Sequence, residues 1–385
     1  MTDASNYRPS SDRPSSGLEF LHENGARRAG GYGDQPSFFG PARAEDEDAP
    51  GADPDTLGPR CDWSYEFRSG LWERVVVRNV APFDPADPLM PRRFVDGKDV
   101  GRVVAYVASP AGFPVPIRLS QIGAVGVRGV SPEGACPGTP IALRVESRRV
   151  ETVVSLMADL FPWEEIERFA AGLHACGFRL LIARRAGPED DPRNVAWLQE
   201  NVRYRTREEM FRLERRAASA SGHDGGAAPV TLADGRLDDK EEIVRGDAPL
   251  IGLVKTHANT SYLHDEGWDV LYALRSGERT PALALTTEKL KLVTWYLRLT
   301  DGDGSPLDGV VRVELSRAFF ENTARGDFAY IDRLSRALCR WRTRDAGYGR
   351  AGVTLHPIQQ AEELLRAHFV STDTLISRFY HLSGL

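Results

Sequence analysis

Arg92-Arg93-Phe94-Val95-Asp96-Gly97 is a short apolar run that ends in an Asp-Gly dipeptide, and the pattern returns in Val230-Thr-Leu-Ala-Asp234-Gly235. Asp-Gly is common in turns, so each stretch predicts a strand followed by a turn. Carboxylates at the ends of neighbouring strands could hold a divalent metal ion for phosphodiester cleavage, because such ions prefer oxygen ligands. The alternative is that each Asp only caps its own turn.

A predicted helix between these two turns carries a third candidate ligand, Glu214. Thr206-Arg-Glu-Glu209 fits a capping box, so the helix should begin there and extend to about residue 221. Its expected buried stripe consists of Met210, Leu213 and Ala217. Glu214 flanks that stripe, where a carboxylate needs either a metal ion or an ionic partner. A salt bridge to one of the nearby arginines is the alternative to metal binding.

A further pair of polar residues, Lys255 and His257, follows the apolar run Leu250-Ile-Gly-Leu-Val254. Alternation along an extended chain places both on one side. Beside a carboxylate cluster they could stabilise phosphate charge, position a water or protonate a leaving oxygen. A surface strand end has a similar appearance, so the sequence leaves both interpretations open.

Three other polar residues have an open relation to the site. Arg312 shares a strand face with Glu314, which is typical of a cross-strand ion pair. His356 stands at a strand-to-helix junction, where a structural histidine is the common interpretation. Glu362 follows in the closing helix. The chain has no phosphate-binding Gly-rich loop, no Gly-x-Ser-x-Gly elbow and no His-Glu-x-x-His, so other chemistry has no supporting motif.

Composition is that of a soluble enzyme with a real core: 385 residues, 41% hydrophobic, with a formal net charge of −6. The acidic mean excludes a global basic field for nucleic acid, although arginines cluster locally. Four scattered cysteines without a Cys-x-x-Cys pair favour a reducing compartment over structural zinc. No apolar run is long enough for a membrane span. We therefore expect a cytoplasmic protein.

Along the chain, residues 1–57 are rich in Ser, Pro, Gly, Asp and Arg, which predicts a disordered tail before one domain over 58–385. The domain should begin with strands at 72–80, 93–96, 102–108 and 117–127, the last three forming an antiparallel meander. Helices are expected over 163–174, 206–221, 327–342 and 358–369, with further strands between the second and third. This order predicts a mixed α/β fold, a mixed sheet flanked by helices.

Ordered blocks of the sequence resemble the NurA-domain nucleases. The first block is Arg93-Phe-Val-Asp-Gly97, and the second runs from Leu232-Ala-Asp-Gly235 to Leu250-Ile-Gly-Leu-Val-Lys-Thr-His257. Closing blocks are Gly309-Val-Val-Arg-Val-Glu314 and the segment 355–366. The resemblance spans about residues 60–380 and excludes the tail.

What the resemblance implies is an RNase H-like nuclease domain that uses Mn²⁺ or Mg²⁺. Such proteins cut single-stranded DNA, resect duplex ends from the 5′ side, form homodimers and work with HerA, a hexameric DNA-translocating ATPase. On matching positions, Asp96, Glu214 and Asp234 take the metal-binding roles, and Lys255 and His257 are auxiliary. We expect a deoxyribonuclease of DNA end resection, repair or phage defence. The alternative is a nucleic-acid-binding or scaffold protein on the same fold that lost metal competence.

Overall fold

The computed structural model describes residues 17–29, 60–66, 72–84, 86–130, 142–184, 191, 193–219, 228–238, 249–257, 263–302, 304–344 and 352–385. Its strands are β1 (Arg27–Arg28), β2 (Arg60–Asp62), β3 (Val75–Val76), β4 (Arg93–Ala108), β5 (Pro114–Val130), β6 (Ala142–Met157), β7 (Arg179–Ala183), β8 (Thr231–Asp234), β9 (Leu250–Val254), β10 (Glu278–Arg279), β11 (Leu283–Thr286), β12 (Lys291–Arg298) and β13 (Val310–Ser316). They form one mixed sheet, whose main path is β2-β11-β12-β13-β9-β8-β4-β5-β6-β7.

The helices are α1 (Glu19–Glu23), α2 (Trp163–Ala175), α3 (Val195–Ser219), α5 (Asp265–Ala273), α6 (Phe328–Trp341), α7 (His356–Arg366) and α8 (Thr372–Ser383). A short 3₁₀ helix, η1 (Ala158–Leu160), and a π-helical turn, η3 (Phe319–Thr323), complete the described elements. The expected mixed α/β fold, with a large sheet flanked by helices, is confirmed. In the described part of the chain, no helix has the length and apolar character that crossing a membrane requires.

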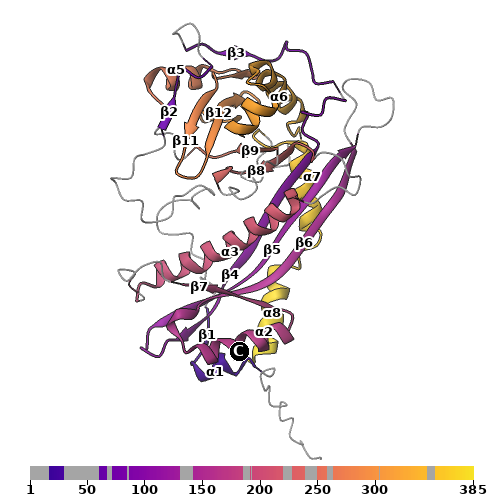
Figure 1. The fold of residues 1–385 in the computed structure, drawn as a ribbon. Coiled ribbons are helices and arrows are strands. Elements are labelled where there is room, and N and C mark those ends of the chain that lie inside the picture. The colour runs from indigo at the N-terminus through magenta and orange to yellow at the C-terminus, as the bar shows by residue number, and fades with distance from the viewer. Residues whose placement is uncertain are drawn as a thin grey trace, which may run out of the picture.

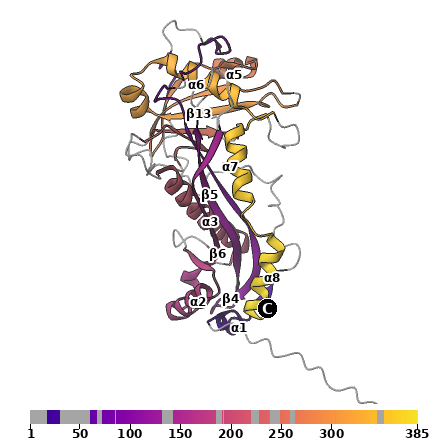
Figure 2. The same ribbon diagram turned by 90° about the vertical axis from the view of Figure 1, so that its right-hand side faces the viewer.

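Three long antiparallel strands, β4, β5 and β6, run along the length of the molecule and connect the ends of an elongated structure (Figure 1). Figure 2 shows α3 on one face of these strands and α7 on the other. On the other side of β4 the pairing changes direction, because β4 pairs with β8, and β8 with β9, in parallel. The carboxyl ends of β8 and β9 therefore lie side by side, next to the first part of β4.

Alternating side chains divide the central core between these two faces. Phe94 and Leu232 belong to the cluster that contains Ile358 and Leu365 of α7. Val95 and Ala233, their neighbours along β4 and β8, belong to the cluster that contains Met210 and Leu213 of α3. Because successive strand residues point to opposite faces, each central strand is buried on both sides. A third cluster fills the far end, under α1, α2 and α8.

The prediction that a strand ends at Asp96 was wrong. β4 continues without interruption from Arg93 to Ala108, and Asp96, Gly97 and Lys98 pair with Val125, Ala124 and Gly123 of β5. Asp-Gly predicts a turn from local preference alone, but pairing along both β4 and β5 overrides that preference. The predicted three-stranded meander was also wrong in its members, because 93–96 and 102–108 belong to the single strand β4 and 117–127 lies within β5. The third antiparallel strand is β6, which the sequence did not predict. The strand expected over 72–80 is shorter, since only Val75–Val76 pairs.

The helix expected to begin at Thr206 instead begins at Val195, so the capping box was also wrong. Thr206 is buried in mid-helix, where its Oγ1 donates to the Val202 carbonyl at 2.8 Å and lies 2.8 Å from Ser155 Oγ. Glu209 pairs with Arg179 and Arg212 rather than with the helix N-terminus. Buried Leu198 and Val202 extend the apolar stripe one further helical repeat toward the N-terminus, which carries the helix past the apparent cap.

The expectation of a disordered tail over 1–57 is contradicted at its described residues, 17–29, and its other residues lie outside the described part of the chain. α1 packs Leu18, Phe20 and Leu21 into the third core cluster, and β1 pairs with the end of β4. The Phe20 ring stacks on Phe169 with centroids 4.6 Å apart. The composition of residues 1–57 did not predict this packing, because only three apolar residues contribute to it within a long polar segment.

Replacing Phe20 with Ala should lower the free energy of unfolding by about 3 kcal/mol, the usual cost of removing a buried aromatic ring. Denaturant titration followed by circular dichroism measures the change. Glu23→Ala is the matched control in the same helix, since the Glu23 side chain is 52% exposed. Equal midpoints for wild type and Phe20→Ala would show that α1 does not contribute to the core.

Candidate functional site

Asp96 and Asp234 occupy equivalent positions on two parallel strands. The last paired residues of β4 and β8 are Val95 and Ala233, so the two aspartates are the next residues on each strand. β8 ends at Asp234, where Gly235 takes a φ of +89°, while β4 continues. Such a φ suits glycine, which has no Cβ, and it turns the chain away from the sheet. The carboxyl groups therefore meet where β8 stops pairing with β4.

Lys255 joins them from the third strand of the parallel set. Asp234 pairs with Leu253 of β9, and Lys255 follows the end of that strand. Its Nζ donates to Asp234 Oδ2 at 2.9 Å, and the lysine side chain is only 8% exposed. The structure thus places the predicted auxiliary lysine directly on one of the predicted metal ligands.

The Asp96 carboxyl is almost completely enclosed, with 6% of the residue exposed. Burial raises its pKa well above the ordinary value, and the nearby negative charge of Asp234 raises it further. Lys255 opposes this shift, whereas Glu214 and Glu362 add to it. Four carboxylates and one ammonium are therefore close enough to act on one another. Concentrated carboxylate charge of this kind is characteristic of functional sites and also of structural ion networks.

Glu214 reaches this region from α3 and lies over Gly97. A Cβ added to Gly97 would meet Glu214 Oε1 at 2.2 Å and its Cγ at 2.6 Å, so Gly97 is the residue that allows the approach. Glu214 is 4% exposed, as its position beside the buried stripe predicted. Since strand residues alternate, Gly97 faces α3 and Asp96 faces α7. Glu214 and Asp96 therefore approach the same stretch of β4 from opposite faces.

Glu362 of α7 is the carboxylate that shares a face with Asp96, and the sequence left its membership of the site open. Lys98 Nζ donates to Glu362 Oε1 at 2.6 Å, and Arg366 Nη2 contacts the same oxygen at 3.2 Å. Lys98 lies two residues beyond Asp96 on β4, so it points to the same face. Glu214 was predicted from its position beside the buried stripe of its helix. The same sequence pattern predicts Glu362, because Glu362 follows buried Ile358 by one helical turn.

His257 is directed away from Lys255, toward β12 and β13. Its Nε2 lies 3.0 Å from the Val310 carbonyl, and its ring is 5.6 Å from that of Tyr296. Burial lowers its pKa, which favours the neutral imidazole. The chain therefore leaves extended geometry after Lys255, and the prediction that Lys255 and His257 share a side does not hold.

Arg312 and Glu314 form an ion pair with each other at 2.7 Å along one strand, and Glu314 Oε2 also accepts from the Leu237 N–H at 2.8 Å. They share a face as expected, but they pair within β13 rather than across strands. This pair braces the segment that follows Asp234 and Gly235. His356 is the exposed first residue of α7.

The donor types of Asp96, Glu214 and Asp234 fit a hard divalent cation, since all three supply carboxylate oxygens. The buried Asp96 carboxyl, whose pKa is raised by its neighbours, is a position where a cation would relieve both burial and repulsion. Within the described residues, no three His, Cys, Asp or Glu side chains are arranged closely enough to hold an ion together. The ligand assignment therefore stays a prediction, which requires side-chain movement around Lys255 or Glu214.

Comparison with known proteins gives no match to a family model and no match to a curated protein sequence. The resemblance to NurA-domain nucleases consequently rests on the sequence blocks and is carried forward as a proposal.

Gly97→Ala should lower the free energy of unfolding by about 1–3 kcal/mol, because the new methyl group would displace Glu214. In a Glu214→Ala background the same substitution should cost much less, since the overlapping atoms are gone. A double-mutant cycle in denaturant measures this coupling. Additive effects of the two substitutions would contradict the close approach of Glu214 to Gly97.

Asp96→Asn should raise the melting temperature at neutral pH in a buffer with chelator. The folded-state pKa of Asp96 lies above the unfolded value, so folding favours the protonated acid and the ionised form costs stability at higher pH. Asparagine removes that cost. The advantage of the variant should shrink as pH falls toward the unfolded pKa, where Asp96 is protonated in both states. Thermal melts across pH test this, and a variant less stable than wild type at pH 7 would contradict it.

Proposed function

We propose that the protein is a metal-dependent deoxyribonuclease with an RNase H-like core. The observation that carries this proposal is the meeting of Asp96 and Asp234 at equivalent positions of parallel strands, with Glu214 packed against the next residue of β4. Burying mutually repelling carboxylates is costly, and a bound cation is a common physical reason for such an arrangement. In the NurA-like resemblance, Asp96 and Asp234 stand within the quoted blocks, and Glu214 is assigned by its helix face and its distance before Asp234.

Strand order supports the same proposal. The central strands run β6-β5-β4-β8-β9, with the first three antiparallel and the last three parallel. α3 connects the two halves in sequence and covers the face of the antiparallel strands (Figure 2). This is the arrangement expected of an RNase H-like core, and it locates the candidate carboxylates on its central strand, on the adjacent strand and on the connecting helix.

In this proposal, Asp96, Glu214 and Asp234 hold Mn²⁺ or Mg²⁺. Because Asp96 faces α7 and Glu214 approaches β4 from the α3 face, Glu214 would have to reach the ion past the end of β8. The ion, when bound, supplies an activated water and stabilises the leaving oxygen of the phosphodiester. Without the ion, Lys255 pairs with Asp234 and neutralises its charge. When the ion binds Asp234, the Lys255 ammonium is released to contact a phosphate of the substrate. His257 is neutral and lies 3.0 Å from the Val310 carbonyl, so its auxiliary role is to position the chain that follows Lys255.

Lys98 and Arg366 provide further positive charge on the α7 face of the site. Both contact Glu362, and their side chains are 22% and 62% exposed. Cations at the rim of a carboxylate centre offset repulsion between that centre and a DNA backbone. These two residues are therefore the proposed backbone contacts on this side of the site.

The substrate and assembly follow from the family resemblance. We propose single-strand endonuclease and 5′-to-3′ exonuclease activity in a homodimer, with a HerA-like hexameric ATPase as partner in cytoplasmic end resection, repair or phage defence. The sequence contains no phosphate-binding loop for ATP, so long resection requires an external motor. The acidic segment 238–242, a candidate for motor docking, lies outside the described residues beyond Asp238.

A second candidate is a nucleic-acid-binding or scaffold protein without catalysis. The specific observation in its favour is the Lys255–Asp234 ion pair at 2.9 Å, which occupies one proposed ligand with the chain's own cation. If that pair persists in the presence of Mn²⁺, the site has replaced the metal with lysine. The two candidates differ in metal binding and in cleavage, and share DNA binding.

Asp96→Asn and Asp234→Asn should each reduce Mn²⁺-dependent cleavage of single-stranded DNA by at least about a hundredfold, because each removes ligand charge with little change in volume. The matched control is Asp99→Asn, three residues along β4, where the carboxylate pairs with Arg118 at 3.3 Å. Its cleavage rate should stay near that of wild type.

Gel-based cleavage assays, combined with DNA binding by fluorescence anisotropy, separate the two candidate functions. Wild-type rates in the Asp96 and Asp234 variants would reject the metal site. DNA binding without cleavage by the wild-type protein, in either metal, would favour the scaffold.

A further inference from the structure

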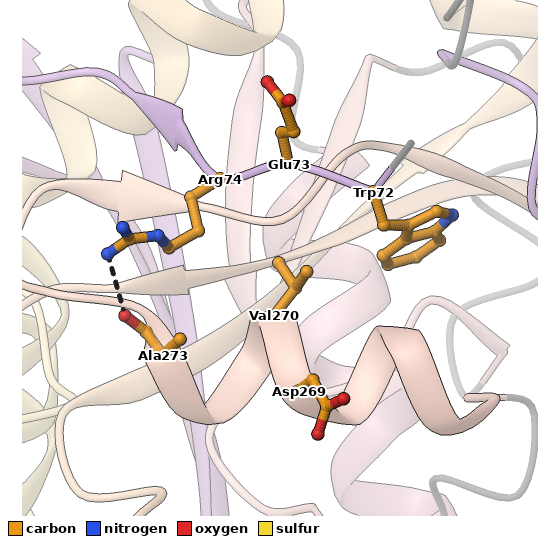
Figure 3. A pocket seen from close by; sticks show the side chains of 6 residues that line it. All are labelled: Trp72, Glu73, Arg74, Asp269, Val270 and Ala273. Carbon is orange, nitrogen blue, oxygen red and sulfur yellow. Dashed lines mark hydrogen bonds between the residues drawn. The ribbon is translucent and has the colours of Figure 1, made fainter. Parts of the chain in front are cut away.

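A groove far from the carboxylate site lies between the segment Trp72–Arg74 and helix α5. Its volume is about 400 Å³, and its lining residues are Trp72, Glu73, Arg74, Asp269, Val270 and Ala273. Figure 3 shows Trp72 and Arg74 extending toward the helix, with Val270 rising between them. Arg74 Nη1 donates to the Ala273 carbonyl at 3.1 Å, which joins the two walls at one end.

Aromatic side chains lie in and near this groove, and Trp72 is the one among its lining residues. Trp72 is one of three contacting rings, with its centroid 5.5 Å from that of Trp63 and 5.2 Å from that of His264. On α5, Tyr272 stacks on Trp268 at 5.4 Å and is 50% exposed. Exposed, preordered aromatic rings are enriched in protein interfaces, where they bury large areas at low entropic cost. A surface of this kind is suited to binding a partner.

The charge around the groove is negative. Asp265, Glu266 and Asp269 are exposed on the first turns of α5, and among the described residues none of them forms an ion pair. Asp265 and Asp269 are one helical turn apart, so they form a row beside the groove. Arg74 offsets this charge only in part, because it shares the Glu278 carboxylate with Arg78, at 3.1 and 3.5 Å. Phosphate backbones are repelled by such a surface, whereas Lys and Arg side chains are attracted.

We propose that this groove is a docking site for a basic segment of a partner protein, whose Lys or Arg side chain lies against the Trp72 ring and pairs with Asp269. The ring face and the carboxylate attract the same cation, one through its quadrupole and the other through its charge. Apolar residues of the segment pack on Val270 and Ala273. The site is independent of the carboxylate centre and of the proposed nuclease activity.

The test uses the full chain and a fluorescein-labelled nonapeptide made of three Arg-Leu-Gly repeats, followed by fluorescence anisotropy. The peptide should bind the wild-type protein, and Asp269→Asn and Trp72→Ala should each weaken binding by about tenfold, a loss of one charged or ring contact. The matched control is Glu200→Gln, an acidic residue on α3 whose side chain is 60% exposed. Its affinity should equal that of wild type.

Four results would overturn the proposal, three with peptides and one with an oligonucleotide. The first is absence of peptide binding at millimolar concentration, and the second is equal affinity of wild type, Asp269→Asn and Trp72→Ala. The third is equal binding of a peptide with Glu in place of Arg. A single-stranded oligonucleotide that competes with the peptide at this groove would likewise reject a protein partner. Melting temperatures of the variants, unchanged from wild type for Asp269→Asn, exclude unfolding as the cause of lost binding.

Discussion

The parallel pairing of β4 with β8 is the interaction on which the rest of the structure depends. It joins the long antiparallel strands to the second half of the sheet, and its register places Asp96 beside Asp234. The consequence is an electrostatic cost, since burial and mutual repulsion raise the pKa of Asp96. Lys255 follows the next parallel strand, β9, and its ion pair with Asp234 offsets part of that cost.

The site is built from both faces of one strand. Alternation along β4 gives Asp96 and Lys98 to the α7 face and Gly97 to the α3 face, where Glu214 fills the space that a side chain would take. A carboxylate from each helix can therefore act on the same aspartate. This explains why a glycine inside a long strand is useful at a position where it otherwise weakens the strand.

The carboxylate centre and the aromatic groove are distinct in their chemistry. The centre combines buried acids with cations at its rim, a pattern suited to metal and phosphate. The groove combines the half-buried Trp72 ring with exposed acids on α5, a pattern suited to a basic protein segment. The two surfaces therefore favour different classes of ligand, and one chain could bind both at once.

By itself, the sequence determined the elements whose apolar pattern is local and strong. The amphipathic stripes predicted α2, α6 and α7 to within a few residues, and apolar runs predicted β8, β9 and β13. It also identified Asp96 and Asp234 as candidates, because each follows an apolar run, and Glu214, because it flanks the buried stripe of its helix. The closeness of Asp96 and Asp234 followed from the expectation that adjacent strands end together, although β4 does not end there.

Only the tertiary structure decided the features that depend on contacts distant in sequence. Asp96-Gly97 is mid-strand because β5 pairs across it. Thr206 is mid-helix because α3 packs it against the sheet, where its Oγ1 lies 2.8 Å from Ser155 Oγ. Phe20 is ordered because Phe169 stacks on it from α2. Glu362 joins the Asp96 face because α7 packs on β4, and His257 leaves it for the Val310 carbonyl. Local preferences of about 1 kcal/mol are smaller than the burial and pairing that such contacts supply, so tertiary packing prevailed at each of these positions.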